Sequence, residues 1–486
     1  MKHRTLVSVV TSGALLSFAG VAAAQTYDTP PPPAAPRPLE IAAPSEQALP
    51  NGLRVVVARR EGVPLVTASL VVLSGSELDP PQLSGLASMT ADLLTQGARK
   101  HTAPQLAAAA EALGGSLESG AGWNQSLVSI TVTTPKLGAA LDLVAEVVRE
   151  PTFAPGEIDR LRAQTLDGLK VSYSNPGALA GLTAVRMAYG SGAWGHPATG
   201  TPASLPRIRR DDLVALHRAT FRPDRAVLIL AGDITPAAGL TLARANFGSW
   251  TAPAGTAPVS PPAPTLADGP AVAVIDMPTA GQAGVALALP LPARRGTDRA
   301  TGAVLNTLLG NGYSSRLNLE IRIKRGLSYG ASSQIESRRE NALFSASLQT
   351  KNESAAEVVQ LLNGEIDRVM LTPVTADELA ARKATLIGGF SRSVETTAGL
   401  ASAIRGLVVT GRSPAELKTQ IASLDAVSAE DVQRYAAANL GAAGRRIAVA
   451  GVAARFAPAL AAQSPGLVTV SQDGLDFERP AGLKRE

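Results

Sequence analysis

The sequence of 486 residues contains no cysteine, only four histidines, and few aromatic side chains, which make up 3% of the chain. The lack of cysteine excludes disulfides, thiolate metal sites, a cysteine nucleophile and lipidation of a cysteine. Charged residues are also sparse, at 17%, and basic residues form no cluster longer than short pairs such as Arg59-Arg60. Nucleic acid is therefore not an expected partner.

The first 24 residues have the pattern of a secretory signal peptide. Lys2 and Arg4 precede an uncharged run from Thr5 to Val21, and three alanines offer a cleavage site before Gln25. The alternative is an uncleaved anchor, which the length of the apolar run permits. Export without disulfides indicates a soluble periplasmic protein of a Gram-negative bacterium, with no stable membrane insertion.

Two proline-rich stretches divide the rest of the chain. We expect residues 25–44 to be a stiff tether and residues 251–270, "TAPAGTAPVSPPAPTLADGP", to be a linker that acts as a hinge. These stretches bound two domains of nearly equal length, an N-terminal domain over 45–250 and a C-terminal domain over 271–472. Residues 473–486 would form a tail.

The two halves repeat the same order of predicted elements. "SLVSITVTTPKLGAALDLVAEVV" is echoed by "ALFSASLQTKNESAAEVVQLLNGEI", with Leu127 matching Leu343, and Gly232 falls against Gly451 at a nearly equal offset. Each half reads as strands, helices and a final strand. This pattern predicts an α+β protein with two homologous domains, each an antiparallel-rich β-sheet covered by α-helices. Two unrelated domains of similar composition are the alternative.

The stretch "GLASMTADLLTQG" predicts a helix from Gly85 to Thr95, capped by Ser84 and closed by Gly97. The side chains of Ser88 and Asp92 would be neighbours on one face of that helix. The following residues are expected to form its buried side: Leu86, Met89 and Leu93.

This helix, the preceding strand "LVTASLVV" and the opening "ALPNGLRVVVARR" resemble the pitrilysin, insulinase and mitochondrial-processing-peptidase family of zinc peptidases, the inverzincins. The resemblance covers the chain from about residue 40 to residue 470. It implies a LuxS/metallopeptidase-like fold that forms half of a clam shell. In the family this helix carries His-x-x-Glu-His, which supplies two zinc ligands and a general base, and a later helix supplies a glutamate ligand.

The residues that match the zinc motif include neither of its histidines nor its glutamate. The two histidine positions are Ser88 and Asp92, the glutamate position is Ala91, and the third ligand should fall near Asp167 or Gly168, where no glutamate stands. A zinc site needs about three protein ligands, so the resemblance implies a degenerate site and no metal in this chain. The remaining histidines form no cluster, and we expect them to be ordinary surface or loop residues: His101, His196 and His217.

The second half retains other features of the family. "LLGNGYSSRLNLEIRIKRGLSYGASSQI" resembles the segment in which the family places an arginine on a helix and a tyrosine on the following strand. Here they are Arg322, on a helix opened by Ser314 or Ser315 and closed by Gly326, and Tyr329, on the strand that follows. The resemblance implies that both residues donate hydrogen bonds to the oxyanion of peptide hydrolysis and grip the substrate. An arginine and a tyrosine that merely pack together are the structural alternative.

The turn of Gly310, Asn311 and Gly312 lies where non-catalytic subunits of the family carry a glycine-rich loop that touches substrate. No phosphate-loop lysine or dinucleotide fingerprint surrounds the turn. The resemblance therefore implies that these three residues belong to the substrate-binding site.

A chain that lacks zinc but keeps the arginine and tyrosine resembles the non-catalytic subunit of the heterodimeric branch of the family. It implies a zinc-bearing homologous partner, a peptide substrate, and metallopeptidase activity only when the two chains are combined. The alternative is a non-proteolytic peptide-binding or assembly scaffold, for which Arg322 and Tyr329 would be dispensable. The sequence offers no serine elbow, Ser-x-x-Lys pair or Walker loop that would indicate another enzyme class.

Overall fold

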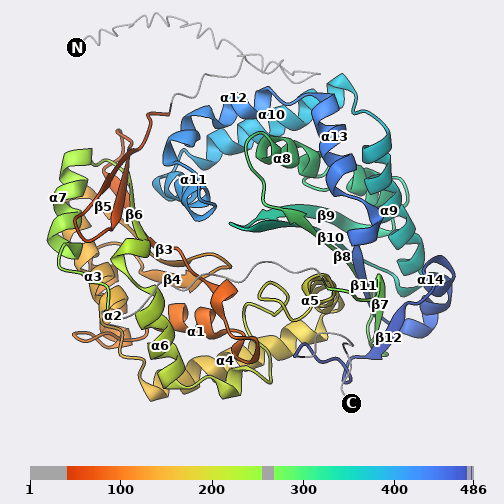
Figure 1. Ribbon diagram of the computed structural model, residues 1–486, viewed down its shortest axis with the longest axis horizontal. Helices are drawn as coiled ribbons and strands as arrows, with labels where there is room; N and C mark the ends of the chain where they lie inside the picture. Colours follow the sequence, from red (N-terminus) through yellow and green to blue (C-terminus); the bar gives the residue numbers. More distant parts are fainter. Residues whose placement is uncertain (1–40, 254–266, 479–482, 484–486) are drawn as a thin grey trace, which may run out of the picture. The chain divides into compact units, whose positions relative to one another are not determined.

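The computed structural model describes residues 41–253, 267–478 and 483, in which each half of the chain contains one six-stranded sheet (Figure 1). The predicted signal peptide, most of the tether and the middle of the linker lie outside the described residues. No helix in the described ranges has the length and apolar character needed to cross a bilayer.

The N-terminal sheet has the strand order β1-β2-β6-β3-β5-β4, and only β2 and β6 are parallel neighbours. The all-apolar run "AVLIL" makes β6 a strand buried on both faces, whereas the alternating pattern "SLVSITVT" gives β5 a more buried and a less buried face. The strands are β1 (Ser45–Ala48), β2 (Arg54–Arg59), β3 (Leu65–Val72), β4 (Glu118–Ala121), β5 (Ser126–Thr133) and β6 (Ala226–Gly232).

The C-terminal sheet has the order β12-β7-β11-β8-β10-β9, with β7 parallel to both β11 and β12. Without the outermost strands β1 and β12, the two orders correspond strand for strand, and the predicted antiparallel-rich α+β fold is confirmed. The strands are β7 (Val272–Asp276), β8 (Ala283–Pro292), β9 (Ser328–Ser337), β10 (Asn341–Thr350), β11 (Arg446–Gly451) and β12 (Val468–Ser471).

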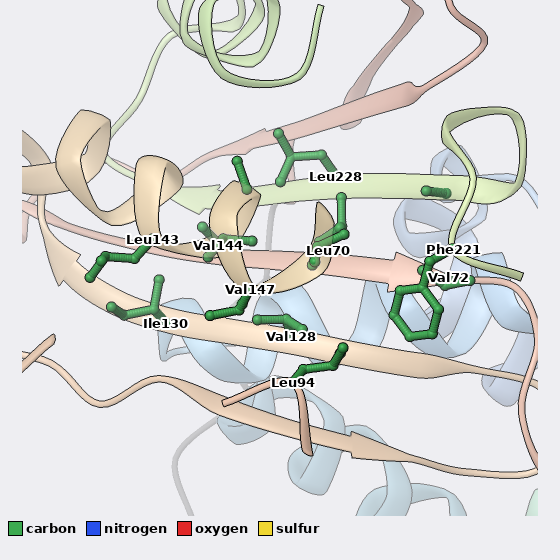
Figure 2. Packing of buried hydrophobic residues seen from close by; sticks show 14 of the residues in the cluster. Leu70, Val72, Leu94, Val128, Ile130, Leu143, Val144, Val147, Phe221 and Leu228 are labelled. Atoms are coloured by element: carbon green, nitrogen blue, oxygen red, sulfur yellow. The ribbon is translucent and has the colours of Figure 1, made fainter. Parts of the chain in front are cut away.

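Helices cover the sheets and bury their apolar faces. Figure 2 shows the N-terminal core, where Leu143, Val144 and Val147 of α3 lie with Val128 and Ile130 of β5. Burial of each such side chain stabilises the fold by about 1.5–3 kcal/mol. The helices of the N-terminal half are α1 (Leu86–Leu93), α2 (Ala103–Ala112), α3 (Leu137–Arg149), α4 (Pro155–Ser174), α5 (Pro176–Tyr189), α6 (Arg210–Thr220) and α7 (Pro236–Phe247). Those of the C-terminal half are α8 (Asp298–Leu309), α9 (Ala355–Leu371), α10 (Ala376–Ser393), α11 (Thr397–Val409), α12 (Gln420–Asp425), α13 (Ala429–Asn439) and α14 (Ala457–Gln463).

The two halves exchange a helix. Helix α5 of the N-terminal half packs on β8 and β11 of the C-terminal sheet, and α11 of the C-terminal half packs on β3 and β6 of the N-terminal sheet. The contact is apolar: Met187 and Tyr189 of α5 belong to the same buried cluster as Ile275 of β7. Leu475 and Phe477, in the segment predicted as a tail, are buried in the same cluster.

The contact made by α11 is more polar. Thr67 Oγ1 of β3 lies 2.8 Å from Thr397 Oγ1 at the start of α11 and 2.8 Å from Thr131 Oγ1 of β5. Ser69 and Ser129 form a second hydroxyl pair, with 3.0 Å between their oxygens. A buried hydroxyl group without a hydrogen-bond partner destabilises the fold. These bonds therefore provide partners for the hydroxyl groups on the face of the sheet that α11 covers.

Candidate functional site

Helix α1, which carries the degenerate zinc motif, starts differently from the sequence prediction. The carboxylate of Asp79 accepts hydrogen bonds from the backbone N–H groups of Gly85 at 2.9 Å and Ala87 at 2.8 Å. The predicted cap by Ser84 is wrong, because its hydroxyl donates instead to Ser204 Oγ at 3.0 Å. Burial raises the pKa of Asp79 well above its usual value, and the two N–H groups only partly offset this increase.

The helix also ends earlier than predicted, at Leu93 rather than Thr95, while Gly97 forms an isolated bridge with Thr102. Its predicted buried side is as expected: Leu86, Met89 and Leu93 are 4%, 2% and 1% exposed. The helix therefore has a clear structural role, since these side chains belong to the N-terminal core.

The positions that match the zinc ligands do not fit a metal ion. Ser88 Oγ donates to the carbonyl of Ala198 at 2.8 Å, Ala91 is fully buried, and Asp92 is half-buried. Asp167 on α4 is 72% exposed and pairs with a lysine instead. Across residues 41–253, 267–478 and 483, no group of three His, Cys, Asp or Glu side chains could hold a metal ion.

Burial is the cause that raises the pKa of Asp92 from 3.8 to about 6. A carboxyl group with this pKa is mostly ionised at pH 7, so its protonation does not exclude a metal ion. The position does not fit a metal ion because Ser88 and Ala91 supply no imidazole or carboxylate beside Asp92.

The three remaining histidines form no metal-binding group within the described residues. His101 Nδ1 is 2.9 Å from Glu146 Oε2, and His217 Nε2 donates to a backbone carbonyl at 2.8 Å. His196 is in a loop, as predicted, but it is 5% exposed and its ring lies 5.6 Å from that of Trp123. Burial is the main cause that lowers the pKa of His196 to about 4.

Arg322 lies on a π-helical segment, Asn318–Ile323, where the sequence predicted an ordinary helix. The helical backbone begins after Ser315 and ends at Ile323. Gly326, in the turn that follows, has a φ of +63° and donates its N–H to the carbonyl of Arg322 at 3.0 Å. A glycine suits this left-handed position because it lacks a Cβ atom. Tyr329 follows near the start of β9.

The guanidinium of Arg322 lies against two tyrosine rings. Its carbon atom is 4.8 Å from the ring centre of Tyr329 and 4.9 Å from that of Tyr313. Each ring can contribute about 0.5–1 kcal/mol through a cation–π contact at an exposed site. Tyr313 was missed in the sequence analysis, although an aromatic residue directly after Gly-Asn-Gly is an unusual feature in this aromatic-poor chain.

These side chains form an exposed surface rather than a buried cluster. Tyr329 is 90% exposed and Tyr313 is 64% exposed. Leu319 and Ile323, on the same π-helical segment as Arg322, are 37% and 44% exposed. The Arg322 patch, defined as Tyr313, Leu319, Arg322, Ile323 and Tyr329, therefore presents one cation among apolar groups to a ligand or partner.

Asn318 connects the three segments that form the patch. Its Nδ2 donates to the carbonyls of Gly312 at 3.0 Å and Ala331 at 2.9 Å. The N–H of Ala331 donates back to Asn318 Oδ1 at 3.1 Å. One buried amide thus ties the glycine turn, the π-helical segment and β9 together, which fixes Arg322 and Tyr329 relative to each other.

Two arginines from outside the patch hold the same turn. Arg382 of α10 donates to Ser314 Oγ at 2.8 Å and to its carbonyl at 2.6 Å, and Arg316 forms a bidentate ion pair with Glu378 at 2.8 and 3.0 Å. Gly310 lies so close to β9 that a Cβ atom there would be 2.3 Å from the backbone nitrogen of Ser333. The turn is therefore held rigidly, as preorganised binding requires.

Comparison with known proteins identifies similar sequences along most of the chain. Residues 54–193 match the family described as insulinase (peptidase family M16), and residues 207–386 match the family described as peptidase M16 inactive domain. The chain is 27% identical to an uncharacterized zinc protease of Streptomyces coelicolor over 81% of its own length and 86% of that protein.

Two further proteins are similar to the chain. A Helicobacter pylori protein described as a non-peptidase homolog is 26% identical over 70% of this chain and 78% of its own length. A crystal structure of a peptidase M16 inactive domain from Pseudomonas fluorescens superposes with a TM-score of 0.79 and 25% identity. That match covers 84% of this chain and 98% of the other.

Proposed function

The chain belongs to the insulinase (peptidase M16) family, and on that premise we propose that it is the non-catalytic subunit of a periplasmic heteromeric zinc peptidase. The observation that carries the proposal is a contrast within one chain. The zinc positions of the N-terminal half hold no ligand set in the described residues, whereas in the C-terminal half a half-buried Arg322 lies against an exposed Tyr329. The zinc would be held by a homologous partner with an intact His-x-x-Glu-His motif.

The chemistry of the Arg322 patch suits peptide hydrolysis. When a peptide carbonyl is attacked, negative charge develops on its oxygen, and fixed donors aimed at that oxygen lower the barrier. The Arg322 guanidinium supplies several N–H donors and the Tyr329 hydroxyl supplies one. Because Asn318 and Arg382 fix the surrounding turn, these donors would need little reorganisation when the substrate arrives.

The apolar members of the Arg322 patch support a role in substrate binding. Leu319 and Ile323 offer exposed apolar area on the same π-helical segment as Arg322, so a peptide could bury side chains there while its carbonyl groups face Arg322. Gly310, Asn311 and Gly312 would line the same path, since Asn318 joins Gly312 to the patch.

The alternative is a peptide-binding or assembly scaffold without proteolysis. It is favoured by the match to a relative described as a non-peptidase homolog and by the absence of a metal-binding group in the described part of this chain. The two functions differ in what Arg322 must do, because a scaffold needs no oxyanion donor.

The test mixes the purified chain with a zinc-bearing relative from the same organism and measures association and peptide cleavage. We expect a complex and a faster rate than with the zinc-bearing chain alone. Arg322→Ala should lower turnover by roughly a hundredfold, as removal of an oxyanion donor does in other enzymes.

The matched control is Arg325→Ala, which removes a nearby arginine that pairs with Glu320 instead of the tyrosines. This control should leave turnover unchanged. If the two chains associate and Arg322→Ala leaves the cleavage rate unchanged, the scaffold function is favoured. If the two chains do not associate, neither the peptidase-subunit function nor the scaffold function applies to a complex with that relative.

A further inference from the structure

A second candidate site lies apart from the Arg322 patch, where the two halves of the chain meet. A cavity of about 320 Å³ is bounded by α5, by the loop that contains His196, and by β8, β9 and β10 of the C-terminal sheet. We call it the Trp123 pocket. The residues that define it here are Trp123, Leu182, His196, Glu336, Arg338 and Leu343.

Arg338 is the most unusual member of this pocket. Its side chain is only 2% exposed, and its Nη2 donates to Glu336 Oε2 at 2.8 Å. Its guanidinium carbon lies 4.4 Å from the ring centre of Trp123 and 5.1 Å from that of Trp194. The aromatic rings therefore cover the guanidinium but do not accept hydrogen bonds from its edge.

The edge of Arg338 retains hydrogen-bonding capacity. Neither its Nε nor its Nη1 has an acceptor within the described residues, and the same is true of Trp194 Nε1. A buried N–H group without an acceptor is costly, and more so when the group is charged. Buried polar groups of this kind are normally satisfied by protein, water or a ligand. Both Arg338 nitrogens expose less than 1 Å² in the structure, so a ligand that provides the acceptor must displace the side chains that cover them.

The surroundings of Arg338 favour a negatively charged acceptor. Arg338 and Arg186 both lower the pKa of the buried His196 beyond the effect of burial itself, which indicates a positive potential. Glu336 neutralises part of this charge, so the pocket suits a single negative charge better than a dianion. A carboxylate has the charge and the geometry that a guanidinium recognises.

The rest of the pocket is suited to a short apolar side chain. Leu182 of α5 and Leu343 of β10 form aliphatic walls, and Gly181 leaves open space on the helix, with no atom within 4 Å of a Cβ placed there. On the same face of β10, Ser345 and Ser347 add hydroxyl groups that can bond a peptide backbone.

The pocket wall is also well anchored across the two halves. Asn124, next to Trp123, accepts a hydrogen bond through Oδ1 from the backbone N–H of Arg339 at 2.9 Å. The loop residue Ala198 accepts from Ser88 on α1 at 2.8 Å, so the pocket adjoins the degenerate zinc position. A ligand bound here would thus contact both halves.

The geometry points to the Trp123 pocket as a binding site for the C-terminal residue of a peptide, with its carboxylate on Arg338 and an apolar side chain between Leu182 and Leu343. This inference extends the proposed function to a peptide terminus, but it uses none of the Arg322 patch and needs no partner chain. Binding can therefore succeed or fail independently of the proposed peptidase complex.

The test measures binding of acetyl-Gly-Gly-Leu as the free acid and as the C-terminal amide to the purified chain, by calorimetry and tryptophan fluorescence. Two of the three tryptophans, Trp123 and Trp194, pack on Arg338, so fluorescence should respond to occupancy. We expect the acid to bind at least tenfold more tightly than the amide. Sodium acetate at equal concentration should compete only weakly, because it lacks the apolar side chain.

A cavity-filling variant tests the location without altering Arg338. Gly181→Leu places a side chain in the open space of the pocket on a helix that favours leucine over glycine, and it should weaken acid binding at least tenfold. The matched control is Gly168→Leu on α4, another helical glycine with no atom within 4 Å of a Cβ, and binding should be unchanged. Equal affinity for acid and amide, no binding of either, or full binding by Gly181→Leu would overturn the proposal.

Discussion

Gly284 of β8 lies directly beneath Gly177 at the start of α5. A Cβ atom on Gly284 would be 2.4 Å from the backbone nitrogen of Gly177, closer than any side chain can approach. The helix that the N-terminal half contributes to the C-terminal sheet therefore begins at a point where two glycine backbones meet. This close approach sets the position of α5 on that sheet.

Gly284→Ala should destabilise the protein, because the added methyl group must push α5 away from β8. We expect the free energy of unfolding to fall by roughly 1–3 kcal/mol, as overpacking does elsewhere. The measurement is a urea unfolding curve. The matched strand control is Gly330→Ala in β9, where a Cβ would have only an ordinary contact at 3.9 Å and stability should change little.

The two tyrosines beside Arg322 should respond differently to substitution in the mixed peptidase assay. Tyr313→Phe keeps the ring that packs on Arg322 and should leave turnover nearly unchanged, whereas Tyr313→Ala should lower it several-fold. Tyr329→Phe removes the proposed hydroxyl donor and should lower turnover by at least tenfold. A full rate for Tyr329→Phe would show that only its ring matters.

Asp92→Asn should stabilise the protein in a pH-dependent way. The pKa of Asp92 is raised from 3.8 to about 6 by burial, so between these values the folded state holds a proton that the unfolded state has released. Stability contributed by this group is thus present below about pH 4 and is lost as the pH rises to about 6. The variant should be more stable than the native chain by about 1–3 kcal/mol at pH 8.

The two proteins should differ little near pH 3.5, and urea unfolding at both pH values measures the difference. Asp167→Asn is the control, since that side chain is 72% exposed. An Asp92→Asn effect of the same size at both pH values would indicate a packing change and contradict the role of burial.

The purified chain should contain no stoichiometric zinc and should cleave no peptide alone, because Ser88, Ala91 and Asp92 offer no ligand set. Metal analysis after mild purification measures the content, and dialysis against a chelator should not shift the unfolding midpoint. About one bound zinc ion per chain would overturn this prediction.

The sequence was sufficient for much of the architecture. The repeated order of strands and helices predicted two related sheets, because alternating and continuous apolar runs report burial directly. The loss of the zinc ligands could be read from five residues, since each missing group removes a specific chemical function. Arg322 and Tyr329 were found through resemblance, because their spacing alone is common to many packed helix and strand pairs.

Tertiary structure decided the contacts between distant segments. The apolar stripe of α5 predicts a buried helix but not that it covers the sheet of the other half, because many apolar surfaces are equivalent partners for such a stripe. Ser84 was predicted as the cap of α1 because it directly precedes the helix, whereas the folded chain places the carboxylate of Asp79 there.

The Arg322 patch could be predicted in part from the sequence, whereas the Trp123 pocket depends on the folded arrangement. The sequence showed which residue types lie near Arg322 along the chain, but only folding placed both Tyr313 and Tyr329 against its guanidinium. Arg338, Trp123 and Trp194 come from loops far apart in the sequence. Hydrogen bonds and cation–π contacts act over a few ångströms, so their partners are set by the folded arrangement and not by sequence spacing.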